Sequence, residues 1–476
     1  MTISNSSGVS LLDDLERKIA DKFPGAFVDK DKARALGLDK ALPSFLVDWL
    51  VSKFTVGDDV DKMRVKQFVD KYLPDKSKAE HIKSEIVGGA ELKIIDRFGV
   101  SVNVSTGIHE LSIPSLDLTC QTVLPSLIEK YPRLLSGSEW GLGTLSYNPY
   151  VGGKKKGSVV LVDFQPFQAF SIDLDYYIEQ RSYFTIEEWI DLIIRSMEYN
   201  SDKFTFEQKL LMLARLVPVL QPRVNQIELG AKGTGKSFVY TKLSKYVWLI
   251  SGGVVTRAQL LYDMSRKKAG IITLYDHIVL DEIQTIDFDK PEEIIGALKG
   301  YLESGAFNIA SYSGTASSGI GILGNIKLTK DHKPVNPVFV VELPPFMQET
   351  AFLDRYHIIL PGWCLPRLNK DHIVSGLALN SEYVSEIFHD LRLRTEYYRF
   401  VEDSVRTKGD LRDINAVKSV ATGLLKLLFP NLERIRKEEF AEFCLEPAIE
   451  YRRNLREQLN YLDPEYKIDI ADIRVS

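Results

Sequence analysis

Residues 227–250 read IELGAKGTGKSFVYTKLSKYVWLI, a short apolar stretch followed by a glycine-rich loop and a segment expected to be helical from Phe238 onward. The loop fits G-x-x-x-x-G-K-[ST] in the strand–loop–helix setting that this pattern requires. Its glycines let several backbone N–H groups point at a phosphate, and a helix N-terminus adds positive potential. The sequence therefore predicts a nucleoside triphosphate site. The residues expected around the phosphates are Gly230, Gly233, Thr234, Gly235, Lys236 and Ser237.

A second apolar stretch supports this prediction because it ends in two carboxylates, Asp281 and Glu282. Lys236 would reach the β- and γ-phosphates, while Ser237 and Asp281 would hold Mg²⁺. Glu282 would act as a catalytic residue that orients and polarises the attacking water. An Asp-Glu pair alone is weak evidence, since such pairs also cap helices. Its value comes from sharing a sheet with the loop, and ATP and Mg²⁺ are the expected ligands.

Three further residues are candidate catalytic groups. Asn325 ends an apolar run, where its amide could bond the γ-phosphate or the lytic water. Arg355 could form an ordinary ion pair with Asp354, or project into a neighbouring subunit's site and stabilise the transition state. Arg412 begins a helical region that would fold over the nucleotide as a lid, and the alternative is a surface arginine near a helix cap.

The pattern of apolar residues predicts four domains. Residues 1–90 show helical spacing, most clearly over 42–54 and 60–72. Residues 91–180 are rich in Val, Ile and Phe between turn residues, which predicts a β-rich module. One form that such a module could take is an OB-like barrel that contacts DNA. Residues 181–375 alternate strands and helices around the glycine-rich loop, and residues 376–476 read as a helical lid and C-terminal helices. The fold class is multidomain α/β.

Composition excludes several classes of protein. The chain has 476 residues, of which 45% are hydrophobic and 26% charged, and its net charge is -5. These shares are ordinary for a soluble globular protein and exclude collagen-like and disordered chains. The mild acidity argues against a protein that coats nucleic acid through its bulk charge, but it is compatible with a local basic channel. No secretory signal is evident, and no apolar stretch reaches the ~20 residues that span a bilayer. We therefore expect a cytoplasmic protein with no membrane contact.

Taken in order, these elements form the set found in AAA+ ATPases, a P-loop core with a helical lid. Several blocks are more specific and resemble the BrxL family, the Lon-related ATPases of the bacterial BREX phage-defence system. These blocks are ELGAKGTGKSFVY (228–240), MQETAFLDR (347–355), LPGW (360–363) and DLRDINAVKSV (410–420). The likeness extends from about residue 12 to about residue 460.

The resemblance implies a ring-forming, DNA-binding AAA+ protein that acts against phage DNA, with an architecture like that of MCM replicative helicases. By position it assigns the nucleotide lysine to Lys236, the metal aspartate to Asp281, the catalytic glutamate to Glu282, the sensor asparagine to Asn325, the trans-acting arginine to Arg355 and the lid arginine to Arg412. It also implies double-stranded DNA, other BREX components and further copies of the chain as partners. The copies would form a hexamer- or heptamer-like ring, single or stacked.

Two features depart from the family pattern. Full-length members continue into a Lon-protease-like domain, whereas only a short tail follows Leu462 here, so no protease activity is expected. In MCM-like rings, the hairpin before the sensor asparagine usually carries a basic residue, but residues 305–326 contain no charged residue. Arg257 or residues 266–268 could contact phosphates instead, although a solvated face is an ordinary place for that triplet.

The leading hypothesis is an ATP-dependent DNA-binding motor or clamp in defence against phage. One alternative is an ATP-dependent protein unfoldase or remodeller that works with a separate protease. Against it, the stretch expected in the pore, residues 252–256 (GGVVT), lacks the aromatic residue that such pores usually present. A further alternative is a scaffold whose assembly is controlled by ATP.

Overall fold

The computed structural model describes residues 13–38, 42–57, 59–103, 107–135, 138–150, 157–167, 172–242, 245–265, 267–470 and 472–475. The chain forms two compact units. The large unit comprises Met1–Ala35, Asp39–Asp48 and Phe170–Ser476, and the barrel unit comprises Leu36–Leu38 and Trp49–Ala169. The boundary expected near residue 90 falls inside the barrel unit, and the one expected near residue 375 falls inside the large unit. The division into four domains stays a prediction.

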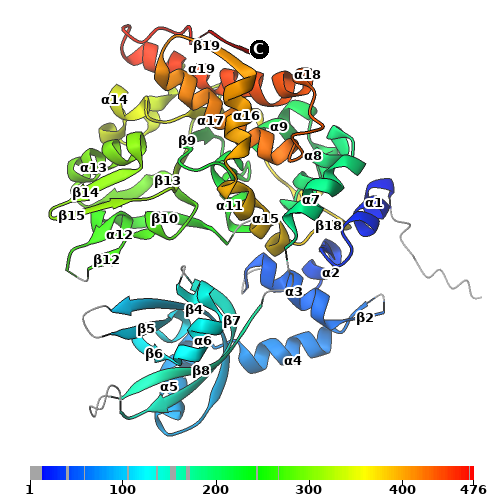
Figure 1. Cartoon of the computed structure of the whole chain (residues 1–476), viewed down its shortest axis with the longest axis vertical. Coiled ribbons are helices and arrows are strands. Elements are labelled where there is room, and N and C mark those ends of the chain that lie inside the picture. Colours follow the sequence, from blue (N-terminus) through cyan, green and yellow to red (C-terminus); the bar gives the residue numbers. More distant parts are fainter. Residues whose placement is uncertain are drawn as a thin grey trace, which may run out of the picture. The chain divides into compact units, whose positions relative to one another are not determined.

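The large unit is built on a parallel sheet of five strands, in the order β10-β13-β16-β9-β17. Figure 1 labels β9, β10 and β13 of this sheet. The strands are β9 (Gln226–Gly230), β10 (Val247–Val255), β13 (His277–Phe288), β16 (Gly319–Asn325) and β17 (Ile358–Pro361). Parallel sheets in α/β proteins are covered on both faces, so their strands read as apolar runs such as Ile278–Leu280. The predicted mixed α/β class, with helical and β-rich regions, is confirmed.

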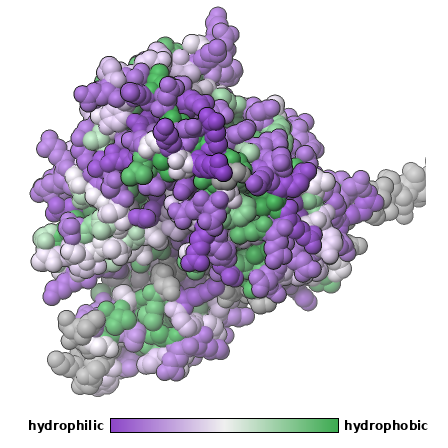
Figure 2. All heavy atoms as spheres, turned by 45° about the horizontal axis from the view of Figure 1, so that its top comes forward, coloured by the Kyte–Doolittle hydropathy of each residue, from purple (hydrophilic) through white to green (hydrophobic). Residues whose placement is uncertain are grey.

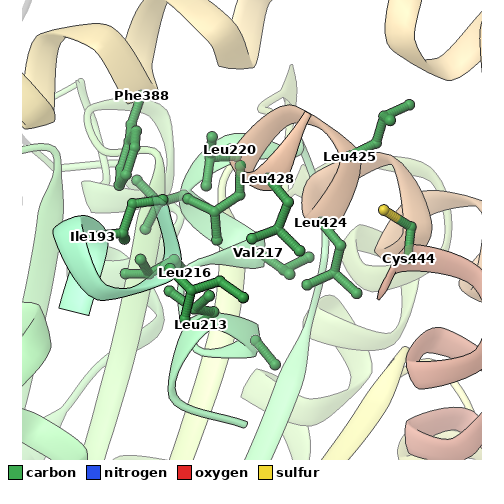
Figure 3. Packing of buried hydrophobic residues seen from close by; sticks show 14 of the residues in the cluster. Ile193, Leu213, Leu216, Val217, Leu220, Phe388, Leu424, Leu425, Leu428 and Cys444 are labelled. Carbon is green, nitrogen blue, oxygen red and sulfur yellow. The ribbon is translucent and has the colours of Figure 1, made fainter. Parts of the chain in front are cut away.

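Alternate residues of these strands enter two different hydrophobic cores, as the two-residue period of a strand requires. In β13, Ile278 and Leu280 belong to one core and Val279 to the other. In β17, Ile359 lies in the first core, while Ile358 and Leu360 lie in the second. Figure 3 shows part of the second core, where side chains of α10 meet side chains of α17.

Helices and pairs of short strands surround the sheet. The helices are α1 (Asp14–Lys22), α2 (Lys30–Arg34), α7 (Leu174–Gln180), α8 (Ile186–Ser196), α9 (Phe206–Ala214), α10 (Val217–Leu220), α11 (Lys236–Lys242), α12 (Arg257–Leu260), α13 (Pro291–Ser304), α14 (Thr350–Leu353), α15 (Ser381–Leu393), α16 (Glu396–Ser404), α17 (Leu411–Leu428), α18 (Lys437–Phe440) and α19 (Glu446–Leu462). The paired short strands are β1 (Phe27–Asp29) with β18 (Leu377–Leu379), β11 (Tyr262–Asp263) with β12 (Lys268–Ala269), β14 (Ala306–Ile309) with β15 (Tyr312–Thr315), and β19 (Val405–Lys408) with β20 (Asp472–Val475).

The first described segment of the chain packs into the large unit. β1 pairs with β18 in antiparallel register, and Ile19 and Phe23 are buried in the same core as α17. The buried Lys30 ammonium lies 2.9 Å from the Asp48 carboxylate. A helix as short as α1 is marginal by itself, so its apolar face is stabilised by this tertiary packing.

The segment after the glycine-rich loop differs from its prediction. The helix expected over residues 238–250 ends at Lys242 as α11, and Val247–Val255 forms β10. β10 pairs in parallel with β13, with Val247 opposite His277. Val-Trp-Leu-Ile is compatible with either structure locally, and this pairing selects the strand because β-branched and aromatic residues pack well in a sheet.

The barrel unit contains a closed barrel with the strand order β4-β5-β6-β8-β7. The strands are β4 (Leu92–Asn103), β5 (Ile108–Ile113), β6 (Leu118–Val123), β7 (Ser138–Asn148) and β8 (Ser158–Pro166), and α6 (Pro125–Lys130) lies between β6 and β7. β6 and β8 are parallel, and the other neighbouring strands are antiparallel. A Cβ atom at Gly143 would lie 2.3 Å from the Phe98 ring, so glycine lets the aromatic core approach β7 closely.

The other elements of the N-terminal region are α3 (Ser44–Phe54), β2 (Thr55–Val56), β3 (Asp59–Val60), α4 (Lys62–Tyr72) and α5 (Ala79–Val87). α3 and α4 confirm the helices expected over 42–54 and 60–72. No helix in the described ranges is both long and apolar enough to cross a bilayer. Hydrophilic residues cover much of the face in Figure 2, with apolar residues in separate groups between them.

Candidate functional site

The 230–237 loop joins β9 to α11 and depends on glycine at several positions. Gly233 and Gly235 have φ values of 81° and 74°, in the left-handed region that favours glycine. Gly230 packs on the backbone of Gly362, where a Cβ atom would lie 2.6 Å from the carbonyl carbon. Thr234 is buried, and its hydroxyl donates to the Ala231 carbonyl. The motif's small residues are therefore required by the conformation and packing of this loop.

Lys236 and Asn325 meet at the carboxyl end of the sheet. The Lys236 ammonium donates to the Ala231 carbonyl at 2.7 Å and to Asn325 Oδ1 at 3.2 Å. Burial lowers the pKa of Lys236 from its ordinary value, and nearby carboxylates, chiefly that of Glu228, offset this in part. Ser237 follows in the first turn of α11 and is half-buried. The side chain of Lys236 is thus directed back over the loop, beside the end of β16.

Gln284, which the sequence analysis did not single out, positions the backbone of Asn325. Its Nε2 donates to the Asn325 carbonyl at 3.0 Å, and its Oε1 accepts from the Asn325 N–H at 3.4 Å. Asn325 is the last residue of β16 and pairs in register with Gly230. The signal for this role in the sequence was that Gln284 is a polar residue two positions after Glu282 in the same expected strand.

Asp281 and Glu282 lie inside β13 rather than at its end, which corrects the expectation. Pairing of β13 with β16 stops at Leu280, while pairing with β10 shifts register between Ser251 and Gly253. Asp281 is buried, whereas Glu282 is exposed and has φ of 48°, a conformation that costs energy for a non-glycine residue. Bulges of this kind re-aim side chains next to active sites. The strand continues beyond Glu282 because pairing with β10 resumes at Ile286.

Beneath the loop lies a buried ion pair that the sequence analysis also missed. Arg215 donates to the Glu228 carboxylate from Nε at 2.9 Å and from Nη2 at 2.6 Å, and Nη2 also reaches the Thr234 carbonyl at 3.3 Å. Both side chains are 1% exposed. Burial opposes the charge on Arg215, but Glu228 raises the pKa of Arg215 above its ordinary value. The signal for this pair was a glutamate between two apolar residues of a buried strand.

We expect Arg215→Met to destabilise the large unit by about 3–5 kcal/mol, because it leaves Glu228 buried without its counter-charge. The midpoint of urea unfolding, followed by tryptophan fluorescence, measures this loss. The double variant Arg215→Met/Glu228→Leu should recover most of the stability, since apolar residues often replace a buried ion pair without loss. A single variant as stable as the parent protein would contradict this account.

Arg355 and Arg412 form a second group. The Glu303 carboxylate lies 3.1 Å from Arg355 Nε and accepts a hydrogen bond of 2.9 Å from Arg412 Nη2. Asp354 does not pair with Arg355, as one alternative proposed, but accepts hydrogen bonds from Arg412 and Arg452. Within the described part of the chain, no hydrogen bond or ion pair joins either arginine to the 230–237 loop. The structure thus brings four of the predicted residues together at the carboxyl end of the sheet, namely Lys236, Asn325, Asp281 and Glu282. It places the two arginines together at Glu303, in a separate group.

Comparison with known sequences identifies the family. The model "Lon-like protease BrxL-like, ATPase domain" matches residues 159–471, a range that contains the loop, the carboxylates and both arginines. The chain belongs to the BrxL family. A second BrxL model, "BREX system Lon protease-like protein BrxL N-terminal", matches residues 21–147. The resemblance drawn from the sequence blocks is confirmed.

Two proteins named Lon-like protease BrxL are similar over 94% of this chain. The protein of Bacillus cereus (strain H3081.97) is 31% identical over 458 residues, and the match covers 67% of its length. The protein of Escherichia coli O9:H4 (strain HS) is 29% identical over 458 residues, with 65% of its length covered. The chain therefore spans about two thirds of the length of these curated BrxL relatives.

Proposed function

We propose that this chain is an AAA+ ATPase that assembles into a ring and acts on double-stranded DNA in BREX defence against phage. The observation that carries the proposal is the meeting of Lys236 and Asn325, 3.2 Å apart, at the sheet edge that also bears Asp281 and Glu282. The strand order supports it, because the first strand, β9, lies between β16 and β17, and α/β sheets bind ligands at such topological switch points.

The residues of this edge fit ATP with Mg²⁺. The loop's positive-φ glycines leave room for phosphate, and a hydroxyl and a carboxylate, from Ser237 and Asp281, are oxygen ligands that Mg²⁺ prefers. The metal ion would neutralise charge on the phosphate oxygens. Lys236 would bind the β- and γ-phosphates, and Asn325 would bond the γ-phosphate or the attacking water. Glu282, exposed at the bulge, would accept the proton of that water.

The position of the arginines supports a site that is shared between subunits. The Arg355 side chain is partly exposed and contacts Glu303 rather than its own loop. In AAA+ proteins a neighbour's arginine completes the site, where it stabilises charge on the transferred phosphoryl group. We propose that Arg355 does this in trans, which would make hydrolysis depend on the ring.

Contact with DNA is supported first by the barrel unit. Its strand order, the parallel pairing of β6 with β8, and the position of α6 between β6 and β7 support an OB-like fold for this unit. OB-folds commonly bind nucleic acid. Residues 154–156 are three lysines for which the sequence predicts a turn, and they lie outside the described residues. We propose that this barrel is one DNA-binding element.

The large unit supplies a second candidate DNA contact at two neighbouring hairpins. The β14–β15 hairpin is uncharged, and its Tyr312 stacks on Tyr262 of the β11–β12 hairpin with ring centroids 3.6 Å apart. The β11–β12 hairpin carries Lys267 and Lys268, both exposed, while Arg266 lies outside the described residues. We propose that these lysines provide the phosphate contact that the uncharged hairpin lacks.

We expect duplex DNA to stimulate ATP hydrolysis. We also expect the double variant Lys267→Ser/Lys268→Ser to bind duplex DNA of any base sequence more weakly. Because each lysine releases about one counterion, the slope of log affinity against log salt should fall by about two. Fluorescence anisotropy with labelled duplex over a salt series measures it. Lys203→Ser, at an exposed lysine between α8 and α9, is the control and should leave the slope unchanged.

Measuring ATP hydrolysis with different added molecules separates the alternatives. Stimulation by an unfolded protein but not by duplex DNA would favour a protein unfoldase or remodeller. ATP-dependent assembly with negligible hydrolysis, with or without DNA, would favour a scaffold. Electron microscopy with ATP should show a ring, and duplex density through its centre is the expected result for the proposed function.

A further inference from the structure

We propose that Glu303 is a positioning residue that holds Arg355 and Arg412 as one pair, so that both act on the same neighbouring nucleotide. This inference rests on the proposed function and assigns a role to a carboxylate outside the motifs. It also changes the expected role of Arg412, from a lid arginine over its own nucleotide to the companion of the trans-acting Arg355.

The contacts at Glu303 carry the inference. A single carboxylate oxygen, Oε2, lies 3.1 Å from Arg355 Nε and 2.9 Å from Arg412 Nη2. Arg412 Nη1 also donates to the Asp354 carboxylate at 2.7 Å, and Arg355 Nη1 donates to the Ala351 carbonyl. Two guanidinium groups that share one oxygen are close neighbours, and like charges at such distances repel unless a counter-charge lies between them. Glu303 supplies that counter-charge.

The backbone around the pair is fixed by buried contacts. Arg452, whose side chain is 1% exposed, donates to the carboxylates of Asp354 and Asp413 at 2.7 Å each. It thereby joins the residue preceding Arg355 to the first turn of α17, which carries Arg412. On the other side, α13 ends at Ser304, Gly305 caps it in the left-handed conformation, and Glu303 lies in its last turn. Three elements distant in sequence thus meet at one carboxylate.

The Glu303 carboxylate is exposed to solvent, whereas the contact between Asp354 and Arg452 is buried. The Glu303 side chain is 44% exposed and that of Arg412 is 40% exposed, whereas Asp354 is 5% exposed. Solvent-exposed ion pairs contribute little to stability. The contact is therefore better suited to orienting the two guanidinium groups than to stabilising the fold, and a misplaced group near the reacting atoms is costly for catalysis.

The test is Glu303→Gln, with Glu293→Gln as matched control. Glu293 lies on the same helix, is 45% exposed and also pairs with an arginine, Arg257, at 3.0 Å. Glu303→Gln should lower kcat by about 10- to 100-fold and leave KM for ATP nearly unchanged. Glu293→Gln should leave both parameters unchanged. A kcat within about twofold of the parent value, or a loss confined to KM, would overturn the proposal.

Two further measurements locate the effect. The losses caused by Glu303→Gln and by Arg412→Ala should be less than additive in free energy, because part of the effect of Glu303 is exerted through Arg412. Mixing Glu303→Gln with Lys236→Ala subunits should restore part of the activity, since the Lys236→Ala subunit still offers a correctly held arginine pair. Additive losses, or no recovery on mixing, would overturn the proposed role of Glu303.

If Arg355→Ala itself hydrolyses ATP normally, the proposed shared site fails. If Arg355→Ala is inactive while Glu303→Gln is normal, only the role of Glu303 fails.

Discussion

Arg355→Ala is expected to lower kcat for ATP hydrolysis by about 10³-fold or more, while ATP binding stays largely intact. The physical reason is that an arginine supplied by a neighbour stabilises charge that develops only in the transition state. Arg355 contacts Glu303 and the Ala351 carbonyl rather than its own 230–237 loop, so its loss should leave that loop undisturbed. Steady-state hydrolysis and binding of a fluorescent ATP analogue measure the two effects separately.

Mixing experiments provide the control for a site shared between copies. Neither Arg355→Ala nor Lys236→Ala protein should hydrolyse ATP alone, because each lacks one half of the site. In a mixed ring, some interfaces combine an intact Lys236 with an intact Arg355, and part of the activity should return. Full activity of the Arg355→Ala protein, or no recovery at any mixing ratio, would contradict a shared site.

Glu282→Gln is expected to slow hydrolysis by about 10²- to 10⁴-fold and to preserve nucleotide affinity, because glutamine cannot accept the proton of the attacking water. The substitution keeps the size of a side chain that sits at φ of 48° in the bulge of β13, so the bulge should persist. Single-turnover hydrolysis with protein in excess over ATP isolates the chemical step.

Glu292→Gln is a suitable comparison, because Glu292 is an exposed glutamate in the first turn of α13 and takes no part in the proposed site. It should hydrolyse ATP at the parent rate. A Glu282→Gln protein that also keeps the parent rate would exclude Glu282 as the base. A parallel loss of nucleotide affinity would show that it acts in binding rather than in proton transfer.

Several parts of the site were predictable because they depend on residues close together in the sequence. The order of glycines, lysine and serine in the 230–237 loop predicts a backbone that bends around phosphate. The apolar run ending at Asp281 predicts a buried parallel strand beside that loop. Asn325 is found at the end of β16, as its run indicated. The roles assigned to these side chains stay predictions until they are measured.

Other features could not be predicted from neighbouring residues. The residues 247–250 suit a helix or a strand locally, and only pairing with β13 makes them a strand. Glu282 sits in a bulge because the register of β13 shifts against β10, which no spacing in the sequence reveals. The hydrogen bonds from Gln284 to Asn325 likewise join residues of two different strands.

The amino-acid sequence alone determined the mixed α/β class, the BrxL family and the candidates for phosphate and metal binding, since these follow from short contiguous patterns. The tertiary structure alone decided that Arg215 neutralises Glu228 beneath the loop and that Glu303 joins Arg355 to Arg412. The physical reason is that burying a charge is costly unless an opposite charge or hydrogen-bonding groups lie close to it in space. Such a partner can come from any part of the chain.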